Sequence, residues 1–156
     1  MVESHSDSSK ALNTVGSYLR TFDALTRYIQ LVLDTHDSNL TQTAIMNALY
    51  IHGRRMRPTD ISKWVFRAKR TVTSVLDTLE RIGVVKRERS KTDRRSVEVV
   101  MTEKGYGKIE ELLPVMQDIS KNILSGLDKE QIETLTIILK QLRKHLLTLI
   151  DSSQSS

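Results

Sequence analysis

Side chains that bind phosphates and base edges are concentrated at the start of the segment from Ala68 to Gly83. Apolar residues recur there at helical spacing and predict one buried stripe, formed by Val72, Val75, Leu76, Leu79 and Ile82. The opposite face would carry Arg70, Thr73, Ser74 and Asp77, with Lys69 and Thr71 on the flanks of the first turn. Cationic and hydroxyl groups donate to phosphates and base edges, and a single helix fits a DNA major groove. For such a helix taken alone, a merely solvated face is the alternative.

The segment after Gly83 has the pattern of a β-hairpin with a basic tip. Val84 and Val85 lead into a charged centre, and Val97, Val99 and Met101 then alternate with other residues. The tip, residues 89–95, contains Arg89, Lys91, Arg94 and Arg95. A basic helix followed at once by a basic hairpin predicts a winged helix-turn-helix, in which the helix reads one groove and the wing reaches the next.

Positive charge is concentrated in this part of the chain. Residues 54–95 contain 14 Lys and Arg against 5 Asp and Glu, a net charge of +9, and the rest of the chain carries −4. A requirement for solubility would scatter the charge, whereas a polyanion-binding surface concentrates it. Double-stranded DNA is therefore the expected partner.

Several other classes of function lack the residues that they need. The chain has no cysteine, which excludes thiol catalysis, disulfides and thiol switches. Its four histidines are scattered, and it has no glycine-rich phosphate loop and no hydrolase motif, so we expect no catalytic site, cofactor or metal. No apolar run approaches the roughly 20 residues that cross a bilayer, and the start lacks the pattern of a signal peptide. We expect a cytoplasmic protein.

Three helices and a turn are predicted before the basic helix. Residues 1–10 are polar and are expected to be disordered, and a long amphipathic helix should follow from Leu12. A second helix would start with Thr41 as its N-cap and end at Gly53, and a short third helix would start at Pro58. Three residues of the third helix should face the core, namely Ile61, Trp64 and Val65. Residues 66–68 form the turn, in which Phe66 is expected to pack, although Trp64 and Phe66 could instead frame a ligand or stack on a base.

The C-terminal third predicts two helices. Thr102 should cap the first, which bends at Pro114 and ends at Gly126, and Asp128 with Gln131 forms a capping box for the second. The second helix has a heptad seam of Ile132, Leu135, Leu139, Leu142, Leu146 and Leu149. This apolar surface predicts an intersubunit partner, and an intrachain helical hairpin is the alternative. Residues 151–156 are expected to be disordered.

Three stretches resemble a known family: TVTSVLDTLE in the basic helix, GVVKRER after it, and DRRSVEVVMTEKG in the hairpin. With these motifs, residues from about Leu40 to Gly105 resemble the MarR family of bacterial and archaeal transcriptional regulators. The family's wing carries an Asp-x-Arg motif, which Asp93 and Arg95 match here. The resemblance implies that Asp93 orients Arg95 for a minor-groove contact. The expected DNA-binding residues are Lys69, Arg70, Thr71, Thr73, Ser74, Lys91, Arg94 and Arg95.

The resemblance also implies a fold and a function. The fold would be mainly α (α+β), with a winged helix-turn-helix at 40–104 and dimerisation helices at 11–39 and 105–150. The function would be that of a homodimeric repressor on a near-palindromic operator, released in many members by a small-molecule effector. Four residues could line an effector pocket, or could equally belong to the core or the surface: Tyr28, Tyr50, His52 and Trp64.

Two features of the turn depart from the family pattern. Phe66 stands where the family usually has a small residue such as glycine, and Ala68, Lys69 and Arg70 replace its commoner polar residues. Lys69 and Arg70 strengthen phosphate or guanine contacts, so they affect which bases are read. A winged helix that binds RNA or protein, without sequence-specific DNA binding, is the alternative function.

Overall fold

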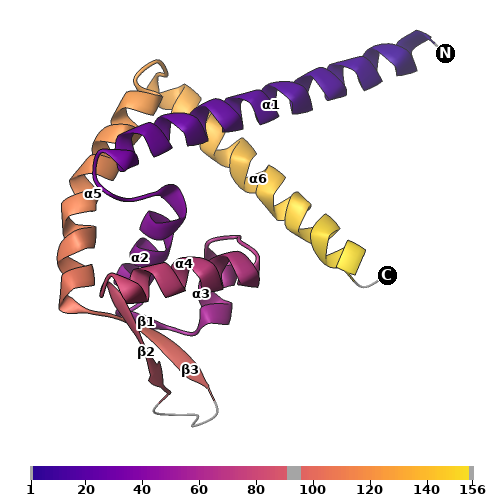
Figure 1. Ribbon diagram of the computed structural model, residues 1–156. Helices are drawn as coiled ribbons and strands as arrows, with labels where there is room; N and C mark the ends of the chain where they lie inside the picture. The colour runs from indigo at the N-terminus through magenta and orange to yellow at the C-terminus, as the bar shows by residue number, and fades with distance from the viewer. Residues whose placement is uncertain (1, 91–95, 155–156) are drawn as a thin grey trace. The chain divides into compact units, whose positions relative to one another are not determined.

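A computed structural model describes residues 2–90 and 96–154, and describes side chains for residues 7–90 and 96–153. Its helices are α1 (Val2–Asp34), α2 (Leu40–Ile51), α3 (Pro58–Trp64), α4 (Lys69–Arg81), α5 (Glu103–Leu124) and α6 (Lys129–Gln154) (Figure 1). The strands are β1 (Arg55–Met56), β2 (Val85–Arg89) and β3 (Val97–Met101). The chain divides after Gln117 into two compact units, so α1 and most of α5 belong to the same unit as the winged helix.

The three strands form one small antiparallel sheet in the order β1-β3-β2. Val85 pairs with Met101 and Arg89 with Val97 along the hairpin, and Arg55 pairs with Val100 on the other side of β3. The helices and this sheet confirm the predicted fold class. Strand β1 was not predicted, because two residues are too short to show any alternating pattern.

One apolar core holds the first unit together. Helices α2, α3 and α4 pack on one another, and all three contribute fully buried side chains. Its members include Leu33, Ile45, Met46, Leu49, Ile61, Val72, Leu76, Leu79, Val85, Val99, Met101, Ile109 and Leu112. Gly105 lies where α5 meets this core, and a Cβ there would stand 2.1 Å from the carbonyl oxygen of Val84. Close approach of α5 to the sheet therefore requires glycine at this position.

The buried stripe of α4 is largely as predicted. Val72, Leu76 and Leu79 are buried, and Val75 is half-buried. Ile82 is exposed, contrary to the prediction. The helix ends at Arg81 and Ile82 is its C-cap, so the helical spacing that placed Ile82 on the stripe no longer applies there.

Local capping patterns account for most helix starts. Pro58 begins α3, Thr102 Oγ1 accepts a bond from the Gly105 amide at 3.1 Å, and Asp128 and Gln131 form the expected box before α6. The prediction of Thr41 as the N-cap of α2 is wrong. Asn39 is the cap, because its side chain accepts from the Gln42 amide and the Gln42 side chain accepts in return from the Asn39 amide.

The terminal helices are longer than expected. Helix α1 includes residues 2–10, which were expected to be disordered, and α6 extends to Gln154. Helix α5, in contrast, continues through Pro114 and ends at Leu124, two residues before the expected Gly126. Extending an existing helix adds one hydrogen bond for each residue that is ordered, so polar residues can continue it without contacts to the core. Leu33 of α1 is buried, whereas Leu12, Val15 and Leu19 are exposed.

The second unit contains the end of α5 and all of α6. The seam residues of α6 from Leu135 onward are exposed in the single chain, as are several apolar residues beside them. These neighbours are Ile137, Ile138, Leu147 and Ile150. Helix α6 thus presents an apolar surface along much of its length.

Candidate nucleic-acid interface

The predicted DNA-binding face of α4 is exposed. Lys69, Arg70, Thr71, Thr73 and Ser74 all lie on the surface of its first two turns. Among the described residues, neither Lys69 nor Arg70 has an ion-pair partner. Two unpaired cations at the start of an exposed helix leave their donors available to phosphates or base edges.

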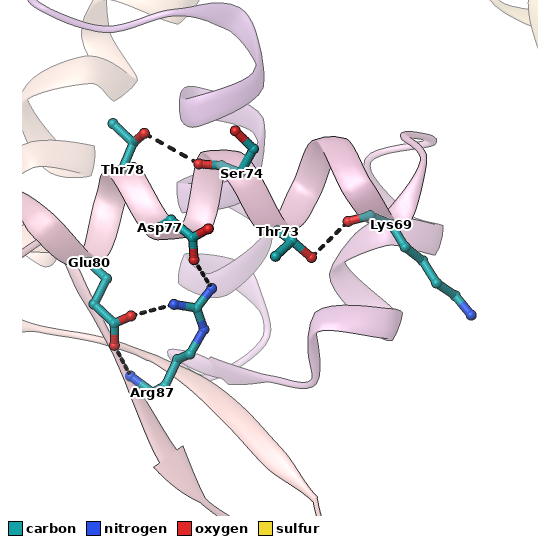
Figure 2. A network of polar contacts seen from close by, with 7 residues as sticks. All are labelled: Lys69, Thr73, Ser74, Asp77, Thr78, Glu80 and Arg87. Atoms are coloured by element: carbon teal, nitrogen blue, oxygen red, sulfur yellow. Dashed lines mark hydrogen bonds and ion pairs between the residues drawn. The ribbon is translucent and has the colours of Figure 1, made fainter.

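Hydroxyl groups along α4 bond back to the helix itself (Figure 2). Thr73 Oγ1 donates to the carbonyl oxygen of Lys69 at 2.9 Å, and Thr78 Oγ1 donates to that of Ser74 at 3.3 Å. These bonds direct the hydroxyl protons into the helix and leave the oxygen lone pairs facing outward. Thr73 in this geometry can accept from a base amino group, and its methyl group can contact a thymine methyl.

The acidic end of α4 is neutralised by the wing. Arg87 of β2 donates to Asp77 Oδ1 at 2.6 Å and to Glu80 Oε2, and its amide donates to Glu80 Oε1 at 2.9 Å (Figure 2). Burial lowers the pKa of Arg87, but its bonds to the two carboxylates outweigh burial and raise the pKa overall. Arg87 therefore joins the wing to α4 and offsets the charge of two carboxylates that would repel DNA.

A second ionic cluster holds the base of the wing. Arg55 of β1 bonds Glu88 at 2.7 Å and Glu98 at 2.9 Å, and Ser90 Oγ donates to Glu98 at 3.0 Å. Bonds from Lys86 and Arg55 lower the pKa of Glu88, and bonds from Arg55 and Ser90 lower that of Glu98. Sequence reasoning missed this cluster, because its arginine lies 33 and 43 residues before its partners.

The pairing reduces the number of cations that are available to DNA. Arg55, Lys86 and Arg87 all lie in the basic window of the sequence, yet each is paired with a carboxylate inside the fold. Lys63 and Arg67, beside the turn into α4, are exposed and have no ion-pair partner among the described residues. These two were not predicted to bind DNA, although both lie within the same basic window.

The predicted wing contacts lie outside the described residues. Lys91, Asp93, Arg94 and Arg95 all belong to residues 91–95, and their roles stay predictions. The stem that carries them is described as far as Ser90 and from Ser96, and the Ser90 amide donates to the Ser96 carbonyl at 2.9 Å.

The aromatic residues around the turn are more exposed than expected. Trp64 was predicted to face the core but is 36% exposed, and Phe66 is 56% exposed. Helix α3 spans only seven residues, and Ile61 and Ser62 occupy its buried side. Trp64 is the last residue of α3. The centroid of its ring lies 6.1 Å from that of His52, in an edge-on contact.

The four candidate pocket residues do not converge. His52 and Trp64 line a hollow of about 630 Å³ with Arg55, Arg57, Asp60, Lys63 and others. The ring of Tyr50 instead lies 5.5 Å from that of Tyr106, and Tyr28 is an exposed residue of α1. The hollow at His52 and Trp64 is shallow and open to solvent. An effector role for these residues stays a prediction.

The part of the chain that the structure describes contains no cluster of three or more His, Asp and Glu suited to a metal ion. Among the same residues, no helix has the length and apolar character needed to cross a membrane.

Comparison with known proteins identifies the family of the helix-turn-helix and the hairpin. The model of the MarR family matches residues 39–97, which cover the helix-turn-helix and the hairpin. The chain is 27% identical over 136 residues to YkoM, an HTH-type transcriptional regulator of Bacillus subtilis, and the match covers 87% of this chain and 88% of YkoM. Residues 39–97 are thus a MarR family domain. As the motifs of its helix and wing predicted, the chain is a DNA-binding transcriptional regulator.

Solved structures of DNA-binding proteins share the fold. Sco3205 of Streptomyces coelicolor, determined in complex with DNA, superposes with a TM-score of 0.83 at 20% identity over 88% of each chain. BpsR of Bordetella bronchiseptica, whose DNA binding is regulated by 6-hydroxynicotinic acid, superposes with a TM-score of 0.76 at 22% identity, covering 83% of this chain and 98% of BpsR.

Proposed function

We propose that this MarR family regulator is a homodimeric repressor that reads a near-palindromic operator through the first two turns of α4. The observation that carries the proposal is the exposed pair of unpaired cations, Lys69 and Arg70, beside three exposed hydroxyl residues. Arginine can make a bidentate contact to guanine, and the threonine and serine side chains can contact either bases or phosphates.

The apolar face of α6 supports the homodimer. Leu139, Leu142 and Leu146 recur at steps of three and four residues and are exposed in the single chain. Exposed apolar surface of this extent marks an association site, and a two-fold dimer would place two copies of α4 on one side of the duplex.

A footprint on the DNA that flanks the protein's own gene tests this function. Two protected segments, related by a two-fold axis and about one helical turn apart, are the expected result. The affinity should fall steeply as salt rises, because cations that neutralise phosphates release counterions. Equal protection of all sequences, or affinity that is insensitive to salt, would contradict the proposal.

Release by a small aromatic acid is the second part of the proposed function. BpsR, with the same fold, has its DNA binding regulated by 6-hydroxynicotinic acid. In this chain the hollow at His52 and Trp64 has aromatic walls, and Arg57 and Lys63 could pair with a carboxylate. Loss of the operator complex on addition of 6-hydroxynicotinic acid or a related ring acid is the test.

The proposed activity is binding without catalysis. Repression needs only competition for the operator, so no side chain has to form or break a bond. The protein would act in the cytoplasm, where the chromosomal operator is accessible.

A further inference from the structure

Phe66 has an unusual backbone conformation for its residue type. Its φ is +52°, in the left-handed region that bulky residues rarely adopt. The turn imposes this conformation, because the Arg67 amide donates to the Ser62 carbonyl at 3.2 Å and Ser62 Oγ donates to the Arg67 carbonyl at 2.6 Å. Glycine would meet the same geometry without strain.

Folding does not explain a phenylalanine at this position. Phe66 is 56% exposed and lies outside the buried core, so more than half of its surface stays in contact with water. A strained backbone combined with an exposed aromatic ring is unfavourable on both counts. Such conformations persist mainly where the residue serves binding or function.

The surroundings of Phe66 indicate what the ring contacts. Lys63, Arg67, Lys69 and Arg70 lie within four positions of Phe66 in the sequence, and all are exposed. None of these four has an ion-pair partner among the described residues. An apolar protein surface would leave four cations unpaired, whereas a DNA strand offers phosphates to the cations and a deoxyribose between them to the ring.

We propose that Phe66 packs against deoxyribose of the DNA backbone at the edge of the groove that α4 enters, with Lys63 and Arg67 on the flanking phosphates. This contact rests on the proposed function and adds a sequence-independent anchor to it. Sugars are the same at every base pair, so the contact should strengthen operator and random DNA binding alike.

Phe66→Gly and Phe66→Asn test the contact without disturbing the turn. Both glycine and asparagine tolerate the left-handed conformation, so both variants should melt at or above the wild-type temperature. Both should bind operator and scrambled duplex roughly 3- to 10-fold more weakly, because the apolar contact is lost. Phe66→Tyr keeps the ring and should keep the affinity. Ile82→Asn removes an exposed apolar residue from the opposite end of α4 and should leave binding unchanged.

The salt dependence separates the ring from its cationic neighbours. Phe66→Asn removes no charge, so the slope of log affinity against log salt should stay at the wild-type value, whereas Arg67→Ala should reduce it by about one unit. Wild-type affinity of Phe66→Asn for both duplexes would overturn the contact while leaving the proposed function intact. A loss confined to the operator would mean a base contact and would overturn the assignment to sugar. Failure of the wild-type protein to bind duplex DNA would overturn the proposed function itself.

Discussion

Arg70 lies on the exposed side of the first turn of α4, where its guanidinium has no partner among the described residues. We predict that Arg70→Ala lowers the free-energy preference for operator over random DNA by about 1 to 3 kcal/mol, because a bidentate guanine contact is lost. Binding curves on operator and scrambled duplex measure the ratio. Arg81→Ala removes the same charge from the last turn of α4 and is the matched control. An unchanged ratio for Arg70→Ala would assign base reading elsewhere.

Arg95 and Asp93 are the predicted contacts of the wing, and both lie outside the described residues. We predict that Arg95→Ala weakens operator and random binding by similar factors, because groove width and phosphate potential dominate minor-groove contacts. Asp93→Ala should have the same effect more mildly, since Arg95 would remain but lose the group that orients it. The same pair of binding curves measures both variants. A collapse of the specific-to-random ratio in Arg95→Ala would reverse the roles of helix and wing.

Helix α4 and the wing are joined through Arg87. We predict that Arg87→Met destabilises the protein by about 1 kcal/mol, since the ion pairs with Asp77 and Glu80 are partly exposed to solvent. DNA affinity should also fall, because Asp77 would face the phosphates unpaired. Adding Asp77→Asn should restore affinity but not stability. Urea unfolding and DNA titration measure the two effects, and affinity that stays low in the double variant would mean that the wing position was lost.

The ionic cluster at the base of the wing predicts a pH dependence. The pKa of Glu98 is lowered by bonds from Arg55 and Ser90, so its contribution to stability is present above the ordinary glutamate pKa and is lost as pH falls through the lowered value. Wild type should therefore be more stable than Glu98→Gln at neutral pH, and the difference should shrink below a pH of about 4. Urea unfolding at several pH values measures this. A difference that is constant with pH would show that charge is not its cause.

The exposed apolar seam of α6 predicts that the whole molecule is a homodimer. Light scattering should give twice the chain mass at micromolar concentration, and Leu142→Asp should give a monomer, because it places a charge in the seam. Lys140→Asp changes the charge of the same helix away from the seam and should leave the dimer intact. A monodisperse wild-type monomer would remove the basis for two-fold operator binding.

Features that depend on neighbours along the chain could be predicted without the structure. The periodic stripe of α4, the hairpin and the capping box at Asp128 each involve residues a few positions apart, so their spacing is visible without a fold. The N-cap of α2 is also a local feature, because Asn39 and Gln42 of its capping box are three residues apart. The prediction of Thr41 was therefore an error in applying a local pattern, and not an effect of the tertiary fold.

Which charges and rings are available to bind became visible only in the folded chain. Arg55 and Arg87 look like DNA-binding cations in the sequence, but Glu98 and Glu80 bind them across strands and helices. Phe66 looks like a packing residue, but the bonded turn between α3 and α4 holds it in solvent. Pairing and exposure depend on distances between residues that are remote in the chain, and no local pattern of residue types contains those distances.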